Sequence, residues 1–139
     1  MRYIVHSLLL LGITVQAVHA YDLTVNVSGA VNEKGAIGVA LHNTAKTFPE
    51  GESFRRQIIS ADTKPLTVYF KNLPAGTYAI SLMHDENENG ILDRNFVGMP
   101  TEYYGFSNNA RGKMGPPTFK QAMFEITDDN VMVAIDLTK

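Results

Sequence analysis

The sequence contains no cysteine and no tryptophan, and only four of its 139 residues are histidine. Without cysteine, the chain forms neither a disulfide framework nor a zinc site with thiolate ligands. The formal net charge is −2, and this lack of a basic excess argues against nucleic acid as a partner, because such proteins carry a basic footprint. The fold must therefore be stabilised by packing, or by something bound, without covalent crosslinks.

Long apolar runs are also scarce, and the single one stands at the start of the chain. Residues 4–18 are mostly apolar, follow the basic Arg2, and lead into Val18-His19-Ala20 before a polar segment. A basic start, an apolar middle and a small-residue cleavage site are typical of a signal peptide. An uncleaved membrane anchor is the alternative, but the run is shorter than the roughly 20 residues that span a bilayer. We expect cleavage after Ala20.

The expected product, residues 21–139, has a length that suits one domain. Removing Arg2 from the twelve basic residues leaves eleven, against fourteen acidic residues. No second apolar run follows, so no transmembrane anchor is expected after cleavage. We therefore expect a periplasmic or secreted protein made of a signal peptide over residues 1–20 and one domain over residues 21–139.

Short blocks of alternating apolar residues recur along this domain, as expected of half-buried strands. The blocks occupy residues 23–27, 37–41, 66–70, 78–82, 122–126 and 131–137. Turn residues at 31–35 predict that the first two strands are antiparallel neighbours, and those at 128–130 predict a C-terminal hairpin. A helical turn is expected within residues 44–61.

These blocks, with no long helical pattern, predict an all-β fold, an antiparallel β-sandwich of about seven strands. A small barrel is the alternative. One long segment, residues 85–117, has few aliphatic residues but many Asn, Gly, Pro and Tyr. Loops of this length are functional or disordered, and the aromatic content of this one favours an ordered loop.

The start of this loop matches the first half of a calcium-binding pattern, D-x-[DN]-x-[DN]-G. A chain that curls around a hard cation offers oxygens from alternate residues, with glycine at the sharp turn and a backbone carbonyl after it. The candidate metal ligands are Asp85, Asn87, Asn89, the carbonyl of Ile91, Asp93 and Glu102. We expect calcium, bound weakly, with a dissociation constant of about 10⁻⁴ to 10⁻³ M as in extracellular modules.

The calcium pattern is incomplete at its twelfth position, where a bidentate Glu is usual and this chain has Phe96. Glu102 is a candidate replacement, returned to the loop by a bend at residues 98–100, and Glu86 or Glu88 are others. The competing interpretation is a plain surface turn, because Asp, Asn and Gly also favour turns without any metal.

A second candidate region follows, in which aromatic rings stand beside small polar residues. A ligand or partner surface there would comprise Tyr103, Tyr104, Phe106, Ser107, Asn108 and Asn109. Exposed rings with adaptable amides suit a glycan or a protein of the cell envelope. The alternative is that the rings pack the long loop onto the sandwich.

The residues for catalysis are sparse. Ser107, His84 and Asp85 can be written as a triad, but an Asp next to its His in sequence seldom orients it. His42 and His84 both end expected strands and, with methionines, are a candidate copper site. The residues favour a non-enzymatic role, with a hydrolase using His84 and the Asn-rich loop as the alternative.

Several runs together resemble the bacterial exported family DUF2141. They are Leu73-Pro74-Ala75-Gly76-Thr77-Tyr78-Ala79-Ile80, His84-Asp85-Glu86-Asn87-Glu88-Asn89-Gly90, Leu92-Asp93, Gly98-Met99-Pro100-Thr101-Glu102 and Tyr104-Gly105-Phe106-Ser107-Asn108-Asn109. The resemblance implies an exported β-rich domain and no specific activity. The first run also resembles a strand connection of prealbumin-like and CnaB-like sandwich domains, which concerns the fold alone.

The sequence therefore predicts an exported β-sandwich of the cell envelope, a binding or interaction module with a calcium-ordered loop. Besides the hydrolase, a purely structural domain without metal is a further alternative.

Overall fold

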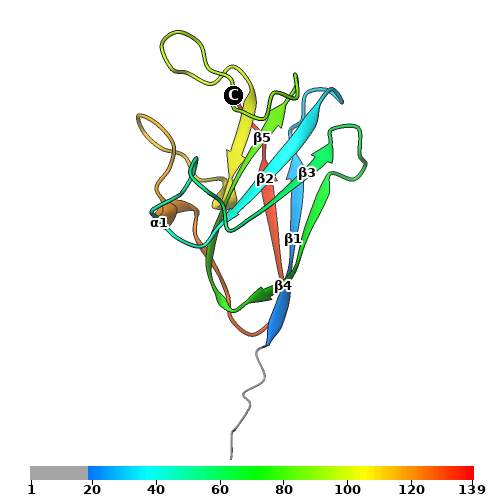
Figure 1. The fold of residues 1–139 in the computed structure, drawn as a ribbon, viewed down its shortest axis with the longest axis vertical. Helices are drawn as coiled ribbons and strands as arrows, with labels where there is room; N and C mark the ends of the chain where they lie inside the picture. Colours follow the sequence, from blue (N-terminus) through cyan, green and yellow to red (C-terminus); the bar gives the residue numbers. More distant parts are fainter. Residues whose placement is uncertain (1–18) are drawn as a thin grey trace, which may run out of the picture.

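The computed structural model describes residues 19–139, so the predicted signal peptide lies almost wholly outside the described residues. Figure 1 shows two layers of strands in an elongated molecule, with long loops gathered on one side. Within the described part, no helix is long and apolar enough to cross a membrane.

The first layer is a sheet of three strands in the order β4 (Thr67–Pro74), β1 (Ala20–Ser28) and β8 (Val131–Asp136). The second has the order β3 (Arg55–Ser60), β2 (Ala36–His42), β5 (Gly76–Asp85) and β6 (Tyr103–Phe106), with β7 (Phe124–Ile126) paired to the start of β5. Two short helices, η1 (Ser107–Asn109) and α1 (Phe119–Ala122), follow β6.

The prediction of an all-β sandwich is confirmed, with eight strands over the described residues. The predicted alternation places one face of each long strand in a shared core between the sheets. The fully buried side chains there include Leu23, Val25, Ile37, Val39, Leu41, Phe70, Leu73, Ile80, Ile126 and Ile135. Burial of about 1.5–3 kcal/mol for each large aliphatic or aromatic side chain drives the two sheets together.

Two predicted strand pairings are wrong. β1 and β2 are not neighbours, because residues 29–35 carry the chain from one sheet to the other. The C-terminal hairpin is also absent, since β7 pairs with β5 while β8 lies parallel to β1. Turn residues show that the chain bends, and alternation shows which side chains face the core. Neither determines which strand is the hydrogen-bonded neighbour, which depends on contacts distant in sequence.

The helical turn expected within residues 44–61 is replaced by turns over residues 45–50 and by β3. The apolar alternation did not predict β3, because β3 is an edge strand that begins Arg55-Arg56-Gln57. Charged residues are common on such edges. The stretch 85–117 is likewise not one loop. β6 and η1 divide it into an ordered loop at 86–102 and a second loop at 110–118.

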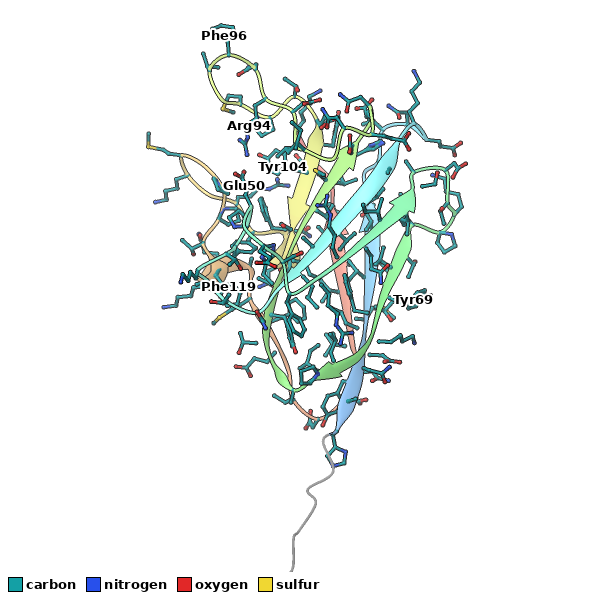
Figure 2. The ribbon with its side chains drawn as sticks, viewed as in Figure 1. Glu50, Tyr69, Arg94, Phe96, Tyr104 and Phe119 are labelled. Atoms are coloured by element: carbon teal, nitrogen blue, oxygen red, sulfur yellow. The ribbon has the colours of Figure 1, made fainter. Side chains whose placement is uncertain are left out.

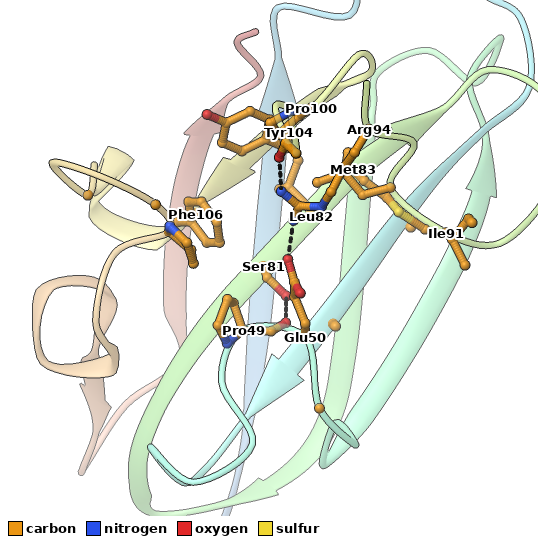
Figure 3. Close-up of a pocket in the computed structure, with 18 of the residues that line it drawn as sticks. Pro49, Glu50, Ser81, Leu82, Met83, Ile91, Arg94, Pro100, Tyr104 and Phe106 are labelled. Carbon is orange, nitrogen blue, oxygen red and sulfur yellow. Dashed lines mark hydrogen bonds and ion pairs between the residues drawn. The ribbon is translucent and has the colours of Figure 1, made fainter. Parts of the chain in front are cut away.

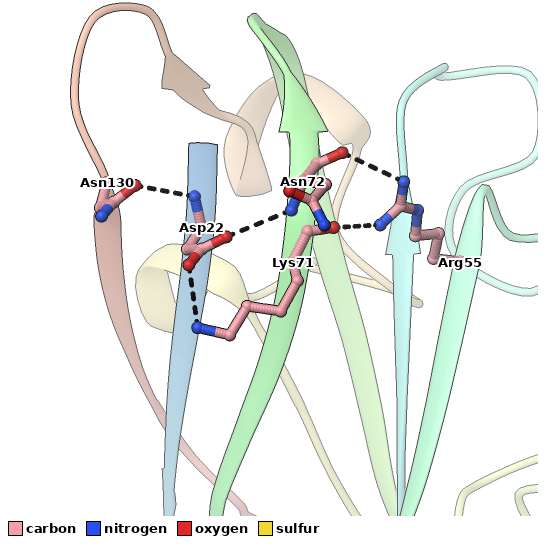
Figure 4. Close-up of polar contacts among 5 residues, drawn as sticks. All are labelled: Asp22, Arg55, Lys71, Asn72 and Asn130. Carbon is pink, nitrogen blue, oxygen red and sulfur yellow. Dashed lines mark hydrogen bonds and ion pairs between the residues drawn. The ribbon is translucent and has the colours of Figure 1, made fainter. Parts of the chain in front are cut away.

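The two sheets are joined at both edges. On one side, Tyr104 of β6 and Thr138 exchange two backbone hydrogen bonds of 2.9 Å. On the other side, Arg55 of β3 donates to the backbone carbonyls of Lys71 and Asn72 on β4 (Figure 4). The two sheets remain separate, but these hydrogen bonds link their edges.

A β-bulge at Asp22 strengthens the second of these borders. The Asp22 carboxylate accepts hydrogen bonds from Lys71 Nζ at 2.8 Å and from the backbone N–H of Asn72 at 3.2 Å (Figure 4). The Lys71 hydrogen bond, aided by that of Asn72, lowers the pKa of Asp22 below its usual value. Asp22 therefore stays charged, holding the twisted end of β1 against β4.

The connection from β4 to β5 crosses between the sheets at Ala75. The Tyr78 hydroxyl donates to the carbonyl of Pro74 at 2.7 Å, which holds this corner closed. The sandwich is consistent with the resemblance to prealbumin-like and CnaB-like domains.

Candidate functional site

The acidic loop, residues 85–93, begins where β5 leaves the sheet. Asp85 is only 5% exposed, and its two carboxylate oxygens accept the backbone N–H groups of Asn89 at 3.1 Å and Gly90 at 2.7 Å. Gly90 has a φ of +82°, which glycine adopts without strain. Asp85 therefore closes the turn, as a short acidic side chain does in an Asx-type turn.

Three polar side chains of this loop converge on one point. The side-chain amides of Asn87 and Asn89 both donate to the carboxylate of Asp93, at 2.7 Å and 2.9 Å. Their oxygens face the backbone instead, where they accept the N–H groups of Asn89 and Ile91, each at 3.1 Å. The Asp93 carboxylate thus has two amide N–H donors where a bound cation would present positive charge.

Glu102 returns to the acidic loop from the far side of the bend at residues 98–100. Its side chain is 6% exposed, and its oxygens accept the backbone N–H groups of Glu86 and Asp93, each at 3.0 Å. Glu86 points elsewhere, to the side-chain amide of Asn32 at 2.9 Å. Of the three candidate replacement acids, Glu102 is the one shown bonded to the loop.

The candidate ligand set is therefore gathered in one loop, but its oxygens are engaged with protein donors. Within residues 19–139, no group of three or more His, Cys, Asp or Glu side chains is placed to hold a metal ion. The loop offers two aspartates and two asparagines, a set of hard oxygen donors that suits calcium better than a transition metal. Calcium binding stays a prediction.

Between Asp93 and Glu102, the chain makes a hydrogen-bonded finger at residues 94–100. Arg94 and Pro100 pair as a bridge, and the Asn95 backbone N–H donates to the Met99 carbonyl at 2.9 Å. The Asn95 side-chain oxygen accepts the N–H of Met99 at 3.0 Å. Figure 2 shows Phe96 at the tip of this finger, pointing away from the body of the protein.

The structure separates the residues of the predicted ligand surface. Tyr103 packs against the core, whereas Tyr104 and Phe106 lie on the outer face of β6. Ser107 is fully buried and is not available to a ligand, because its hydroxyl bonds the backbone of Ile80 and Ala122. Much of this segment therefore serves packing.

The two asparagines that follow also bond the fold. The side-chain amide of Asn108 donates to the carbonyls of Gln121 and Met123, at 3.2 Å and 2.9 Å. The side-chain oxygen of Asn109 accepts the N–H of Asp136 at 2.9 Å. Neither interaction is visible in the sequence, because the partners lie 13 to 27 positions away.

The candidate catalytic triad is not assembled by hydrogen bonds in the described part of the chain. His84 is fully buried with its Nε2 at 2.7 Å from the carbonyl of Lys34, while Asp85 bonds its own loop and Ser107 bonds β5 and α1. His42 and His84 do not meet as a copper site either. They lie at opposite ends of the β2 and β5 pair, in which His42 faces Ala79.

A cleft of about 810 Å³ lies on the outer face of the second sheet (Figure 3). Its floor is made by Gly38 and Ala40 of β2 and Ser81 of β5. Walls come from three segments, residues 49–53, 90–100 and 112–116. The hollow exists because small side chains cover the middle of the sheet while long loops rise around it, and its size is that of small-molecule sites.

An aromatic cluster adjoins this cleft, comprising His42, Phe48, Tyr104, Phe106 and Phe119, of which Tyr104 and Phe106 line it. Phe48 is its centre, with ring centroids 5.5 Å from His42, 5.8 Å from Phe106 and 5.8 Å from Phe119. Edge-to-face contacts of this kind are favourable beyond simple burial. The cluster packs Phe48 of residues 45–50 and Phe119 of α1 against the sheet, and these segments adjoin the walls at 49–53 and 112–116.

His42 is the buried imidazole of this cluster. The ring is fully buried, and Nε2 lies 3.2 Å from the Ser81 hydroxyl, which donates in turn to the carbonyl of Pro49 at 2.9 Å. Burial lowers the pKa of His42, and a hydrogen bond with the Pro49 backbone opposes this only in part. Burial therefore favours the neutral form of the His42 ring.

Comparison with protein families gives one match. The model of a family described as an uncharacterized protein conserved in bacteria, DUF2141, matches residues 25–134. The chain belongs to this family. The matched region contains the whole acidic loop and all residues lining the cleft in this DUF2141 domain. No curated protein and no solved structure matched the chain.

Sequence analysis missed the cleft of this DUF2141 domain, although one signal was present. Gly38 and Ala40 alternate with the large core residues of β2, so the outer face of a central strand carries almost no side chain. Such a face is either covered by another element or left as a hollow. The lining also includes Arg56 of β3, a strand that the sequence pattern did not indicate.

Proposed function

We propose that this DUF2141 domain is an exported, non-enzymatic binding module whose outer cleft takes a ligand. The observation that carries the proposal is the cleft itself, about 810 Å³ with a floor of small residues and walls from three loops. A site of this size suits a small molecule. The non-enzymatic role is supported by the buried and mutually separate positions of His84 and Ser107.

The acidic loop forms part of the same site. Gly90, Ile91 and Leu92 line the cleft directly, so the conformation of residues 85–93 sets the shape of one wall. In our proposal calcium orders this wall, bound by Asp85, Asn87, Asn89, Asp93 and the carbonyl of Ile91, with Glu102 holding the loop from behind. The two asparagine amides would turn their oxygens toward the ion, replacing the N–H groups that now face Asp93.

The cleft is tested by filling it. We expect the uncharged dye Nile red to bind and fluoresce with the native protein, and Ala40→Phe to weaken binding at least tenfold because its ring occupies the floor. The matched control is Ala134→Phe, which places the same ring on an exposed position of β8 in the other sheet. Equal dye binding by Ala40→Phe and the native protein, with both folded, would contradict a ligand site in this cleft.

The calcium wall is tested by melting the protein in chelator and then in millimolar calcium. Calcium tenfold above its dissociation constant stabilises the fold by about 1.4 kcal/mol, which raises Tm by about 5 °C for a domain of this size. Asp93→Asn should remove this rise, because it takes the charge from the point where Asn87 and Asn89 converge. Asp62→Asn, an exposed site outside the loop, should keep it.

Magnesium gives a second control for the same experiment, because its smaller octahedral shell fits this flexible oxygen set poorly. Glu88→Gln tests whether Glu88, another candidate for the missing acidic ligand, binds calcium. This variant should show the same rise in Tm with calcium as the native protein. A rise of equal size in Asp93→Asn and the native protein would show that the acidic loop is a hydrogen-bonded turn without metal.

A further inference from the structure

The charged side chains that line the cleft do not balance. They are Glu50, Arg56, Arg94 and Lys113. Glu50 and Arg94 form an ion pair across the cleft, drawn in Figure 3, and neutralise each other. Within residues 19–139, neither Arg56 nor Lys113 has a carboxylate partner at ion-pair distance. Two positive charges therefore remain in the site, although the chain as a whole is negative.

Arg56 is an exposed residue of the edge strand β3, and its guanidinium reaches over the floor of the cleft. A Cβ built on Gly38 would stand 3.6 Å from the Arg56 guanidinium and 3.5 Å from the Met83 methyl group. The guanidinium and the thioether therefore flank the same bare position on the floor. A guanidinium has five donors in a planar fork that matches carboxylate and phosphate oxygens.

The side chains that line the cleft around the Arg56 guanidinium are largely apolar. Three of the lining residues are methionines, Met83, Met99 and Met114, and they stand with Ile91 and Phe106. Met114 is fully exposed, and Met99 and Ile91 are each about 60% exposed. Thioether side chains adapt to ligands of variable shape, and apolar side chains left open to water favour an apolar ligand that covers them.

We propose that the cleft binds a single-chain amphiphile with an anionic head group. The head pairs with the Arg56 guanidinium beside Met83, Lys113 on the 112–116 wall adds to the positive potential of the site, and the aliphatic chain lies along Met83, Met99, Met114 and Phe106. This inference rests on the proposed function, since it names the ligand class of the same cleft. Charge complementarity selects this ligand over an uncharged one, because two exposed cations without carboxylate partners beside apolar walls attract a negative group.

The test measures displacement of Nile red by decanoate, decyl phosphate and decanol, all below their micellar concentrations. Decanoate and decyl phosphate should displace the dye at concentrations at least tenfold lower than decanol. In Arg56→Gln, the concentration of decanoate or decyl phosphate that displaces the dye should rise about tenfold. The concentration of decanol that displaces the dye should stay within twofold of its value for the native protein. Lys64→Gln, which removes one positive charge from an exposed ion pair with Glu33, should change neither.

The outcomes separate this inference from the proposed function. Equal displacement by decanoate and decanol, or an equal loss for both in Arg56→Gln, would overturn the anionic head while leaving the cleft as a ligand site. An uncharged apolar peptide that displaces the dye better than decanoate would overturn the amphiphile in favour of a peptide ligand. The relative strength of decanoate and decyl phosphate tells whether the head group is a carboxylate or a phosphate.

Discussion

Replacing Gly35 by alanine should lower the free energy of unfolding by roughly 2–5 kcal/mol, measured by urea denaturation at 25 °C. Gly35 has a φ of +70°, a conformation that costs other residues about 1–2 kcal/mol. An added Cβ would also lie 2.1 Å from the carbonyl oxygen of Asp85 and 2.8 Å from Glu86 Cα. Both contacts are with backbone, so no side chain can turn away, and overpacking of this kind costs about 1–3 kcal/mol.

The matched control is Gly90→Ala within the acidic loop. Gly90 also has a positive φ, of +82°, but a Cβ there meets nothing within 4 Å. It should cost only the conformational part, about 1–2 kcal/mol. If Gly35→Ala proves no more destabilising than Gly90→Ala, the close approach of residues 29–35 to the acidic loop is not present in solution.

The result for Gly35 also bears on the site, because the connection from β1 to β2 supports the root of the acidic loop. Lys34 accepts a hydrogen bond from His84, and Asn32 donates to Glu86. Gly35 directly follows Lys34 and touches the first peptide of the loop, at Asp85 and Glu86. The acidic loop is therefore held from behind by a segment that the sequence suggested was only a hairpin turn.

Replacing Ser107 by alanine should destabilise the protein by about 2–4 kcal/mol. The buried Ser107 hydroxyl accepts the backbone N–H of Ile80 at 2.9 Å and donates to the carbonyl of Ala122 at 2.5 Å. Its removal leaves two interior backbone groups without partners, and each such group costs about 1–3 kcal/mol. Urea denaturation measures the loss, and amide hydrogen exchange at Ile80 should become faster.

Ser60→Ala is the control for this substitution. Ser60 is an exposed residue of β3, so its change should stay within about 0.5 kcal/mol. A Ser107→Ala protein as stable as the native one would contradict the buried hydrogen-bond bridge. It would also reopen Ser107 as a residue available to a ligand.

Much of the fold was predictable, for a reason that particular strands show. In β1 and β2 the residues Leu23, Val25, Ile37 and Val39 recur at every second position, which is the period of a strand with one buried face. β3 was not predictable in this way, because its Arg and Gln residues suit an exposed edge and break the pattern. Strand pairing was predicted wrongly wherever it joined segments far apart in sequence.

The candidate site likewise has a part that was predictable from the sequence, the acidic loop, and a part that was not, the cleft. Asp85, Asn87, Asn89 and Asp93 could be grouped from their spacing, because a tight loop keeps neighbouring residues close together. The return of Glu102 depended on a bend that was visible as Gly98-Met99-Pro100. The cleft was not predictable, since its lining combines β2, β3, β5 and β6 with three loops.

By itself, the sequence determined which residues are buried in the strands, where the acidic turn lies and that no disulfide can stabilise the domain. These are local properties, set by side-chain period, turn chemistry and composition. Only the tertiary structure decided which strands pair, that Ser107 is buried, and that Arg56 stands beside Met83 on a floor of small residues. Those relations join residues distant in the chain, and they exist only after packing of the two sheets and their loops has brought them together.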